Sequence, residues 1–470
     1  MIHQYTQFGQ NIVLDIESGA IHVVSDVAAL MCGYIEAMLK SGKATMPKNC
    51  PVDLRYSLAK YESSEVQAAY AELLELYENG LIFSNGDDSE ANLLPPKDPP
   101  IKALCLNVAH ECNMDCAYCF AGGGHFGSDA FEANTRLMSE QTAMNAIKFL
   151  LESSQSRKNL EVDFFGGEPL LNFEMIKAIV QKTRKLEKSY GKNVRFTLTT
   201  NGILLDDEKI DFINANISNI VLSLDGTKET NDAMRKYCGG GSYENIVPKY
   251  QKLVSKRTNP DYKSYYIRGT FTKKNLDFSK DAAHMRELGF EHISIEPVVA
   301  KEVEEYAITK EDLPKIFAEY EKLAREMIKR ERQKKDTFNF FHFDIDLQNG
   351  PCLKKRAKGC GSGSEYLAIV PNGDVYPCHQ FAGNDKYKLG NVNDPNVRLD
   401  HDMMRKFLEN NITSNQACKN CWAKYFCGGG CPANNENFNG DISSPYELAC
   451  QMEKKRVECA IAIKAVLSGM

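Results

Sequence analysis

The segment from Glu111 to Cys119 most constrains what this chain can fold into. It reads ECNMDCAYC and places Cys112, Cys116 and Cys119 in the spacing CxxxCxxC. Three thiolates at this spacing can bind three corners of an iron-sulfur cube and leave the fourth iron without a protein ligand. A zinc site needs four ligands, and a disulfide framework needs an even number of cysteines. The spacing therefore predicts an iron-sulfur cluster with one open iron rather than three unrelated core cysteines.

The composition of the chain excludes several classes of protein. Its 470 residues are 43% hydrophobic and carry a net charge of -6, which fits a folded chain of roughly two to four domains and disfavours a nucleic-acid partner. The first residues lack the basic and apolar segments of an export signal, and no apolar run approaches membrane-spanning length. We therefore expect a cytoplasmic protein with no membrane partner, whose 16 cysteines mainly bind metal.

Residues 1–90 are expected to form a small N-terminal domain. Apolar stretches on both sides of a Gly-containing turn, Asn11–Ile16 and Ala20–Val24, predict a hairpin, and an apolar helix follows it. A second helix is expected over Ser64–Tyr77, and a short strand over Leu81–Phe83.

The next part of the chain, residues 101–310, alternates short apolar strands with helical segments, which predicts an α/β fold built as a partial (β/α)6 barrel. The six expected strands are Ala103–Val108, Leu160–Phe165, Arg195–Thr199, Asn219–Leu224, Tyr265–Phe271 and His292–Glu296. The CxxxCxxC segment directly follows the first strand, at the barrel face where enzymes of this architecture hold their reactive groups. We expect 91–100 to be a linker, 311–348 a bridging helical region, and 349–470 a Cys-rich domain.

Polar and glycine-rich motifs follow the next strands. Gly166 and Gly167 would let the backbone approach a ligand closely, and Glu168 can pair with an ammonium group. Polar side chains at later strand ends suit ribose hydroxyls, although each could instead simply close a β-turn. These residues are Thr199, Asn201 and Ser223.

Seven cysteines recur in the C-terminal region at fixed spacings. They are Cys360, Cys378, Cys418, Cys421, Cys427, Cys431 and Cys450. Paired CxxC motifs commonly bind structural zinc, whereas seven thiols behind a cluster-binding loop favour further iron-sulfur clusters.

The barrel motifs resemble those of the radical S-adenosylmethionine (SAM) enzymes. In that family the open iron chelates the amino and carboxylate groups of SAM, and reduction of the sulfonium releases a 5'-deoxyadenosyl radical. The resemblance implies that the Gly-Gly-Glu-Pro turn at Gly166–Pro169 binds the SAM amino group. It also assigns SAM contacts to Tyr118, Thr199, Asn201 and Ser223, with Arg268 as the candidate for the SAM carboxylate.

The C-terminal cysteines resemble the pattern of the SPASM extension, which binds two auxiliary [4Fe-4S] clusters and would bring the total to three. By that resemblance Cys360, Cys378 and Cys431 hold the first auxiliary cluster, and the four remaining cysteines of the set hold the second. The fourth ligand of the first cluster stays open between Cys352 and a Cys of the substrate.

The whole chain resembles the maturases of "six cysteines in forty-five residues" peptides, with residues 1–90 similar to a winged-helix peptide-recognition domain. The resemblance implies that the enzyme forms thioether crosslinks from a Cys sulfur to a carbon of another residue, often Thr. Its substrate would be a ribosomally made Cys-rich precursor peptide held by its leader, and its electrons would come from a flavodoxin or ferredoxin. One alternative is an anaerobic sulfatase-maturating enzyme. The other, a non-catalytic electron-transfer or zinc scaffold, leaves the Gly-Gly-Glu-Pro motif unexplained.

Overall fold

The computed structural model describes residues 1–42, 45–85, 98–121, 136–259, 262–347 and 357–469. Its centre is a ten-stranded sheet in the order β13-β12-β11-β8-β7-β6-β4-β14-β15-β16. Six of these strands are parallel neighbours in chain order, which is the arrangement of a barrel wall. They are β4 (Ala103–Ala109), β6 (Asn159–Gly166), β7 (Asn193–Thr200), β8 (Asn219–Ser223), β11 (Ser264–Phe271) and β12 (His292–Pro297).

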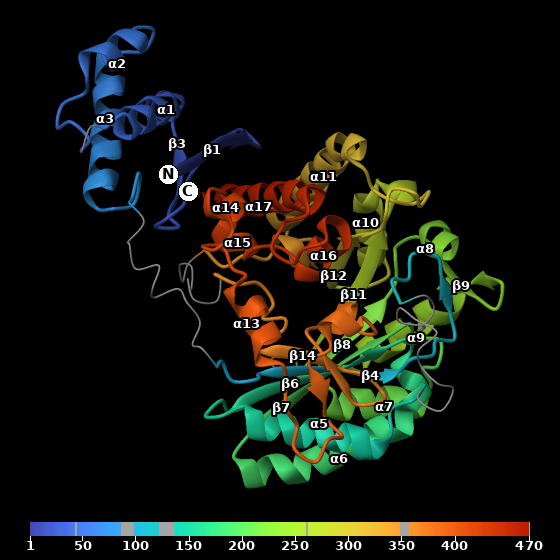
Figure 1. The fold of residues 1–470 in the computed structure, drawn as a ribbon. Helices are drawn as coiled ribbons and strands as arrows, with labels where there is room; N and C mark the ends of the chain where they lie inside the picture. The colour runs from blue at the N-terminus through green and yellow to red at the C-terminus, as the bar shows by residue number, and fades with distance from the viewer. Residues whose placement is uncertain (43–44, 86–97, 122–135, 260–261, 348–356, 470) are drawn as a thin grey trace.

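Side chains alternate between the two faces of each barrel strand. On β6, Leu160, Val162 and Phe164 are buried in the main core, whereas Asp163 and Phe165 point to the opposite face of the strand and are less buried. Helices connect the strands, and α5, α6 and α7 lie together on one face of the sheet (Figure 1). The connecting helices are α5 (Glu140–Ser153), α6 (Phe173–Tyr190), α7 (Asp207–Asn216), α8 (Lys228–Met234), α9 (Tyr243–Ser255) and α10 (Phe278–Glu287), and α11 (Leu313–Gln333) follows β12.

The N-terminal region is an antiparallel sheet of β1 (Ile2–Gln7), β2 (Gln10–Asp15) and β3 (Ile21–Val24), followed by α1 (Asp26–Lys40), α2 (Val52–Ser57) and α3 (Ser63–Glu78). The side chain of Ser25 caps α1 by accepting a hydrogen bond from the backbone N–H of Ala28. Inside β2, Val13 packs in the cluster formed with the helices, and Ile12 and Leu14 pack on the opposite side. Both faces of this sheet are therefore covered.

The C-terminal region joins the barrel sheet directly. Strand β14 (Tyr366–Ile369) pairs in parallel with β4. Strand β15 (Asp374–Tyr376) pairs antiparallel with β14, and β16 (Gly390–Asn391) pairs antiparallel with β15. On the other edge, the short β13 (Asn339–Phe340) pairs with β12. The remaining helices are α13 (His401–Glu409), α14 (Gln416–Lys419), α15 (Lys424–Cys427), α16 (Pro432–Asn439) and the long α17 (Glu447–Ser468).

All six predicted barrel strands are present, and α3 and α11 occupy the stretches predicted to be helical. The predicted hairpin is present as β2 and β3, and β1 adds a third strand to it. Two expectations need correction: the region predicted only to bridge with a helix also contains β13, and Leu81–Phe83 is not a strand. Phe83 has φ of 52°, in the left-handed region that extended strands exclude. The N-terminal arrangement is not shown to be a winged helix, and the predicted domain boundaries stay predictions.

Candidate functional site

The CxxxCxxC loop lies on the turn made by Gly166 and Gly167. The N–H of Gly167 donates to the carbonyl of Ala109 at 2.7 Å, and the N–H of Glu168 donates to the carbonyl of Glu111 at 2.8 Å. A Cβ on Gly167 would lie 2.1 Å from the Glu111 oxygen, and one on Gly166, whose φ is +135°, would lie 2.3 Å from the Ala109 oxygen. The two glycines therefore allow close contact with the backbone at Ala109 and Glu111, next to the CxxxCxxC loop, and their predicted approach to a ligand stays a prediction.

Glu168 is fully buried and accepts hydrogen bonds from the protein itself. Its Oε1 accepts from the hydroxyl of Thr200 at 2.7 Å and the N–H of Leu170 at 3.0 Å, and its Oε2 accepts from the N–H of Asn201 at 2.8 Å. Burial raises the pKa of this carboxyl, and the three donors oppose that shift. Glu168 thus fixes the end of β7 against the turn after β6.

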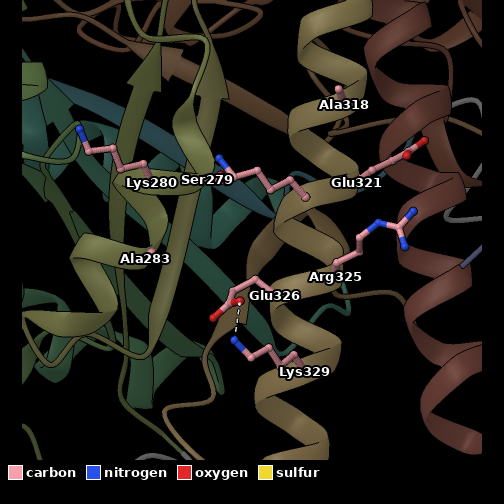
Figure 2. A pocket seen from close by; sticks show the side chains of 9 residues that line it. Ser279, Lys280, Ala283, Ala318, Glu321, Arg325, Glu326 and Lys329 are labelled. Carbon is pink, nitrogen blue, oxygen red and sulfur yellow. Dashed lines mark ion pairs between the residues drawn. The ribbon is translucent and has the colours of Figure 1, made fainter.

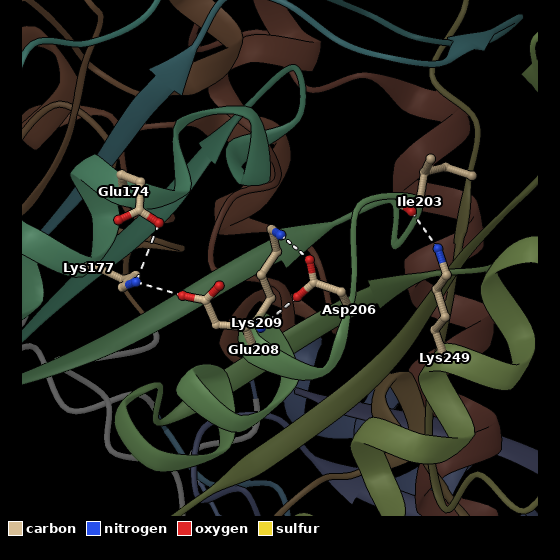
Figure 3. Close-up of polar contacts among 7 residues, drawn as sticks. All are labelled: Glu174, Lys177, Ile203, Asp206, Glu208, Lys209 and Lys249. Carbon is tan, nitrogen blue, oxygen red and sulfur yellow. Dashed lines mark hydrogen bonds and ion pairs between the residues drawn. The ribbon is translucent and has the colours of Figure 1, made fainter.

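Asn201 connects the end of β7 to the first cysteine. Its Nδ2 donates to Asn113 Oδ1 at 2.8 Å and lies 3.6 Å from Cys112 Sγ. Figure 3 shows how the segment after β7 is held in place. Lys249 from α9 donates to the carbonyl of Ile203 at 2.5 Å, and Asp206 caps α7 by accepting from the N–H of Lys209 at 2.9 Å.

A second small sheet holds the middle of the cluster loop. Strand β5 (Asp115–Cys116) pairs antiparallel with β9 (Arg235–Tyr237), so that Cys116 lies opposite Arg235, and β10 (Gly240–Gly241) completes this sheet. The Arg235 guanidinium donates to the hydroxyl of Tyr118 at 3.0 Å, and this hydroxyl donates to Asp225 at 2.7 Å. Burial raises the pKa of Asp225 to about 6, against the pull of Arg235.

Sequence reasoning missed Arg235. It is 7% exposed, and among the described residues its Nε has no hydrogen-bond partner. The only sequence signal that could have indicated Arg235 was its position ten residues after Asp225, in the segment that follows the strand ending at Ser223. The guanidinium provides a buried positive charge beside Cys116, and it opposes the rise that burial causes in the pKa of that thiol.

Arg268, the predicted carboxylate ligand, lies in a different environment. It pairs across the sheet with Ser223, and its side chain is 55% exposed. Its nearest acidic group is Glu296, at 3.8 Å. Thr199 lies on β7, which pairs with the strand that carries Ser223, and it is half-buried at the same end of the sheet.

The ten cysteines proposed as cluster ligands fall into three groups of neighbours. Cys116 and Cys119 lie near Cys112, and burial, with a smaller contribution from these two neighbours, raises the pKa of Cys112 to about 11. Cys360 and Cys431 lie near Cys378, Cys418 and Cys427 lie near Cys450, and Cys421 lies near Cys418. All described cysteines are free thiols. Cys352 lies outside the described residues.

The first two groups lie close together. Cys119, Cys378 and Cys431 contribute to one apolar cluster that also contains Phe165 from the end of β6. The ring of His379, next in the chain after Cys378, lies 4.7 Å from the ring of Phe165. The group of Cys360, Cys378 and Cys431, hereafter the first auxiliary group, therefore lies beside the end of β6.

The positions of the described side chains do not distinguish zinc from clusters. In the described part of the chain, no three Cys, His, Asp or Glu side chains converge as ligands of one metal ion would. The assignment of the ten cysteines to clusters stays a prediction from the sequence.

Two further structural features lie apart from this site. A cavity of about 560 Å³ lies between α10 and α11 on the outside of the barrel, and none of the candidate site residues lines it (Figure 2).

None of the helices described in the structure is both long and apolar enough to cross a membrane.

Two protein-family models match parts of this chain. Residues 106–267 match the radical SAM superfamily, and residues 360–422 match the SPASM iron-sulfur cluster-binding domain. A cysteine-type anaerobic sulfatase-maturating enzyme of Clostridium perfringens is 25% identical over 374 residues, which cover 77% of this chain and 96% of that enzyme.

Two solved structures share the fold. One, anSMEcpe with bound AdoMet, has a TM-score of 0.60 and 19% identity and covers 79% of this chain and 100% of its own. The other, Streptococcus suis SuiB bound to S-adenosylmethionine, has a TM-score of 0.51 and 15% identity and covers 96% of this chain and 98% of its own.

Proposed function

We propose that this chain, which carries a radical SAM domain followed by an SPASM domain, is a maturase that forms thioether crosslinks in a Cys-rich precursor peptide. The observation that carries the proposal is the N-terminal antiparallel sheet with its helices, placed before a radical SAM barrel. Such a sheet can bind an extended peptide by strand addition. A leader-bearing peptide substrate would need a site of this kind.

The residues present fit SAM and three [4Fe-4S] clusters. Cys112, Cys116 and Cys119 would hold the cluster that binds SAM. Cys360, Cys378 and Cys431 would hold the first auxiliary cluster, and Cys418, Cys421, Cys427 and Cys450 the second. When bound, these groups would supply a 5'-deoxyadenosyl radical and an acceptor for one electron, with a flavodoxin or ferredoxin as the source of reducing electrons.

Arg235 is a better candidate than Arg268 for the SAM carboxylate. Arg235 is buried beside the cluster loop and keeps a free Nε donor, and a guanidinium in a low-dielectric site pairs strongly with a carboxylate. Arg268 is exposed in the barrel interior and is better placed to contact the peptide. Tyr118 and Asp225 would then hold Arg235 in position rather than contact SAM.

The first auxiliary group is the better placed of the two to act on the peptide. Thioether formation removes a hydrogen atom from the acceptor carbon and a proton and an electron from the donor Cys, so the sulfur must be held near that carbon. Cys378 and Cys431 share an apolar cluster with Cys119, which brings this group next to the radical site. A substrate Cys or Cys352 would complete its ligand set.

The leader would add to the free edge of β3. Among the described residues no strand pairs with β3 on the side away from β2. In an antiparallel ladder the hydrogen-bonded pairs alternate, and Asp15 already donates to Ala20 at the turn, so the N–H groups of Ile21 and Val23 point away from β2. These two donors could pair with a peptide strand.

Val23→Pro tests the leader site because it removes one outward donor and keeps the pairing with β2. We expect a fluorescently labelled leader peptide, taken from a short Cys-rich reading frame beside this gene, to bind the variant at least about tenfold more weakly, measured by anisotropy. Thr6→Pro on the opposite edge strand, β1, is one control, and Val23→Ala, which trims the side chain packed on the α17 cluster but keeps the N–H, is the other. Equal leader affinity of Val23→Pro and wild type would contradict the assignment.

The alternative function is anaerobic sulfatase maturation, which the similarity to the Clostridium perfringens enzyme favours. One anaerobic reaction separates the two. Cluster-loaded protein is incubated with SAM, dithionite and either the Cys-rich peptide or a sulfatase-derived peptide containing a Cys. Loss of two hydrogen atoms with a new bond from sulfur to carbon supports the thioether proposal, whereas conversion of a Cys to an aldehyde in the sulfatase peptide alone would overturn it.

A further inference from the structure

The N-terminal sheet packs directly on the C-terminal helix α17. Ile12 and Leu14 of β2 are buried in one cluster with Val457, Ile461 and Ala462, and Trp422 lies at its margin. Tyr5 of β1 donates its hydroxyl to the carbonyl of Glu458 at 3.0 Å. In Figure 1 the dark blue strands lie beside the red helix α17.

Two side chains of this sheet reach the segment between Cys421 and Cys427. The ring of His3 stacks on the indole of Trp422, with ring centroids 3.7 Å apart and an interplanar angle of 3°. The carboxylate of Glu17, in the turn between β2 and β3, accepts from Lys424 Nζ at 2.7 Å and from the Tyr425 hydroxyl at 2.8 Å.

These contacts are shielded from solvent and geometrically defined. The side chains of Lys424 and Glu17 are 11% and 17% exposed, so water screens their ion pair less than one at the surface. His3 is fixed in turn by Glu458, whose Oε1 lies 3.1 Å from His3 Nε2. The orientation of the imidazole on Trp422 is therefore set by the protein and not by the stack alone.

The contacted segment has little structure of its own. Helix α15 spans only Lys424–Cys427, and a helix of four residues does not hold its shape without tertiary contacts. Trp422 directly follows Cys421, and Cys427 ends α15, so the segment joins two of the four thiols of the second auxiliary group. Whatever fixes this segment also fixes the distance between those thiols.

We propose that residues 1–24 form one wall of the second auxiliary cluster site, with His3 and Glu17 as positioning residues for the segment from Trp422 to Tyr425. The proposal rests on the proposed function only in assigning a cluster to Cys418, Cys421, Cys427 and Cys450. It gives the N-terminal sheet a role in cluster binding besides peptide recognition. It also predicts that this cluster depends on residues more than 390 positions away in the sequence.

The test uses full-length, cluster-loaded protein. Iron release to bathophenanthroline and the electron paramagnetic resonance spectrum are measured for His3→Ala, Glu17→Gln and the double variant. We expect release from one cluster to be faster by on the order of tenfold in the double variant, with a changed signal for that cluster. His3→Phe keeps an aromatic ring on Trp422, so it should release iron as slowly as the wild type, unlike His3→Ala. Tyr56→Ala, at an exposed aromatic residue of α2, is the control.

Cys418→Ala identifies the signal of the second auxiliary cluster. Unchanged release and an unchanged signal in the double variant, combined with loss of a cluster in Cys418→Ala, would overturn this proposal alone. Full iron content in Cys418→Ala would overturn the ligand assignment of the proposed function, and this proposal with it. A melting curve for each variant separates cluster loss from global unfolding, and release that only follows a lowered melting temperature also counts against positioning.

Discussion

Gly167→Ala should remove radical chemistry without unfolding the protein. The new Cβ would lie 2.1 Å from the carbonyl oxygen of Glu111, whereas ordinary contact begins at 3.4 Å. The loop that carries Cys112 must therefore retreat by about 1.3 Å, the difference between these distances. This movement breaks the 2.8 Å hydrogen bond from the N–H of Glu168 to Glu111.

The energetic cost of Gly167→Ala can be estimated from two effects. Overpacking costs about 1–3 kcal/mol, and leaving a buried hydrogen bond unmade costs about 1–3 kcal/mol. Their sum is below the stability of many domains, so the barrel should still fold. A displacement of about 1 Å at a reactive group can reduce the rate roughly 100-fold, so we expect SAM cleavage to fall by at least that factor.

The assay measures 5'-deoxyadenosine formed anaerobically from SAM and dithionite, together with iron content and the melting temperature. Gly33→Ala in α1 is the control, because no atom lies within 4 Å of its added Cβ. Wild-type SAM cleavage by Gly167→Ala would refute the reasoning that this glycine is needed for close approach of the cluster loop. A large fall in Gly33→Ala as well would show that the loss is not specific to the turn.

Three other predictions follow from the site. Replacing Cys112, Cys116 and Cys119 together by Ala should remove about 4 of roughly 12 irons and all SAM cleavage, and zinc in place of iron in that variant would contradict the C-terminal cluster assignment. Asp163→Asn should raise the free energy of unfolding at pH 7.5 by about 1–3 kcal/mol, because burial raises the pKa of Asp163 to about 6 and disfavours its ionised form. Urea titrations should show this gain shrinking as the pH falls below 6 and the wild-type carboxyl takes up its proton; a gain that does not vary with pH would contradict it. Cys352→Ala should keep the first auxiliary cluster if a substrate Cys is the fourth ligand, and its loss, together with a wild-type cluster signal that a Cys-containing peptide leaves unchanged, would favour pure electron transfer.

The barrel strands were predictable because their signal is local. On β6, β7 and β8, buried apolar residues alternate with less buried ones, and the helices between these strands repeat an apolar stripe. Because parallel strands run in the same direction, their C-terminal ends place Gly166, Asn201 and Ser223 at the same end of the barrel. Local sequence pattern and parallel topology were therefore sufficient to predict these strands and the residues at their ends.

The missed elements depend on pairing between distant segments. Strand β14 reads as a short apolar run, and only its contact with β4, more than 250 residues earlier, makes it part of the barrel sheet. Arg235 acquires its importance in the same way, because β9 pairs with the cluster loop and buries a guanidinium there. No periodicity in the sequence encodes either pairing.

Removing residues 1–90 would not isolate peptide recognition in this chain. The strand β2 is buried on both faces because Val13 packs against α1 while Ile12 and Leu14 pack against α17. Truncation would expose that apolar surface of α17 and also remove the stack on Trp422, so loss of leader binding and loss of a cluster would occur together. The side chain of Val23 also packs against the α17 cluster, so Val23→Pro has to be compared with Val23→Ala, which trims the same side chain and keeps the outward N–H. Changes at His3 or Glu17 leave the β3 edge in place. Only such point variants can show whether the N-terminal sheet recognises the peptide, supports the second auxiliary cluster, or does both.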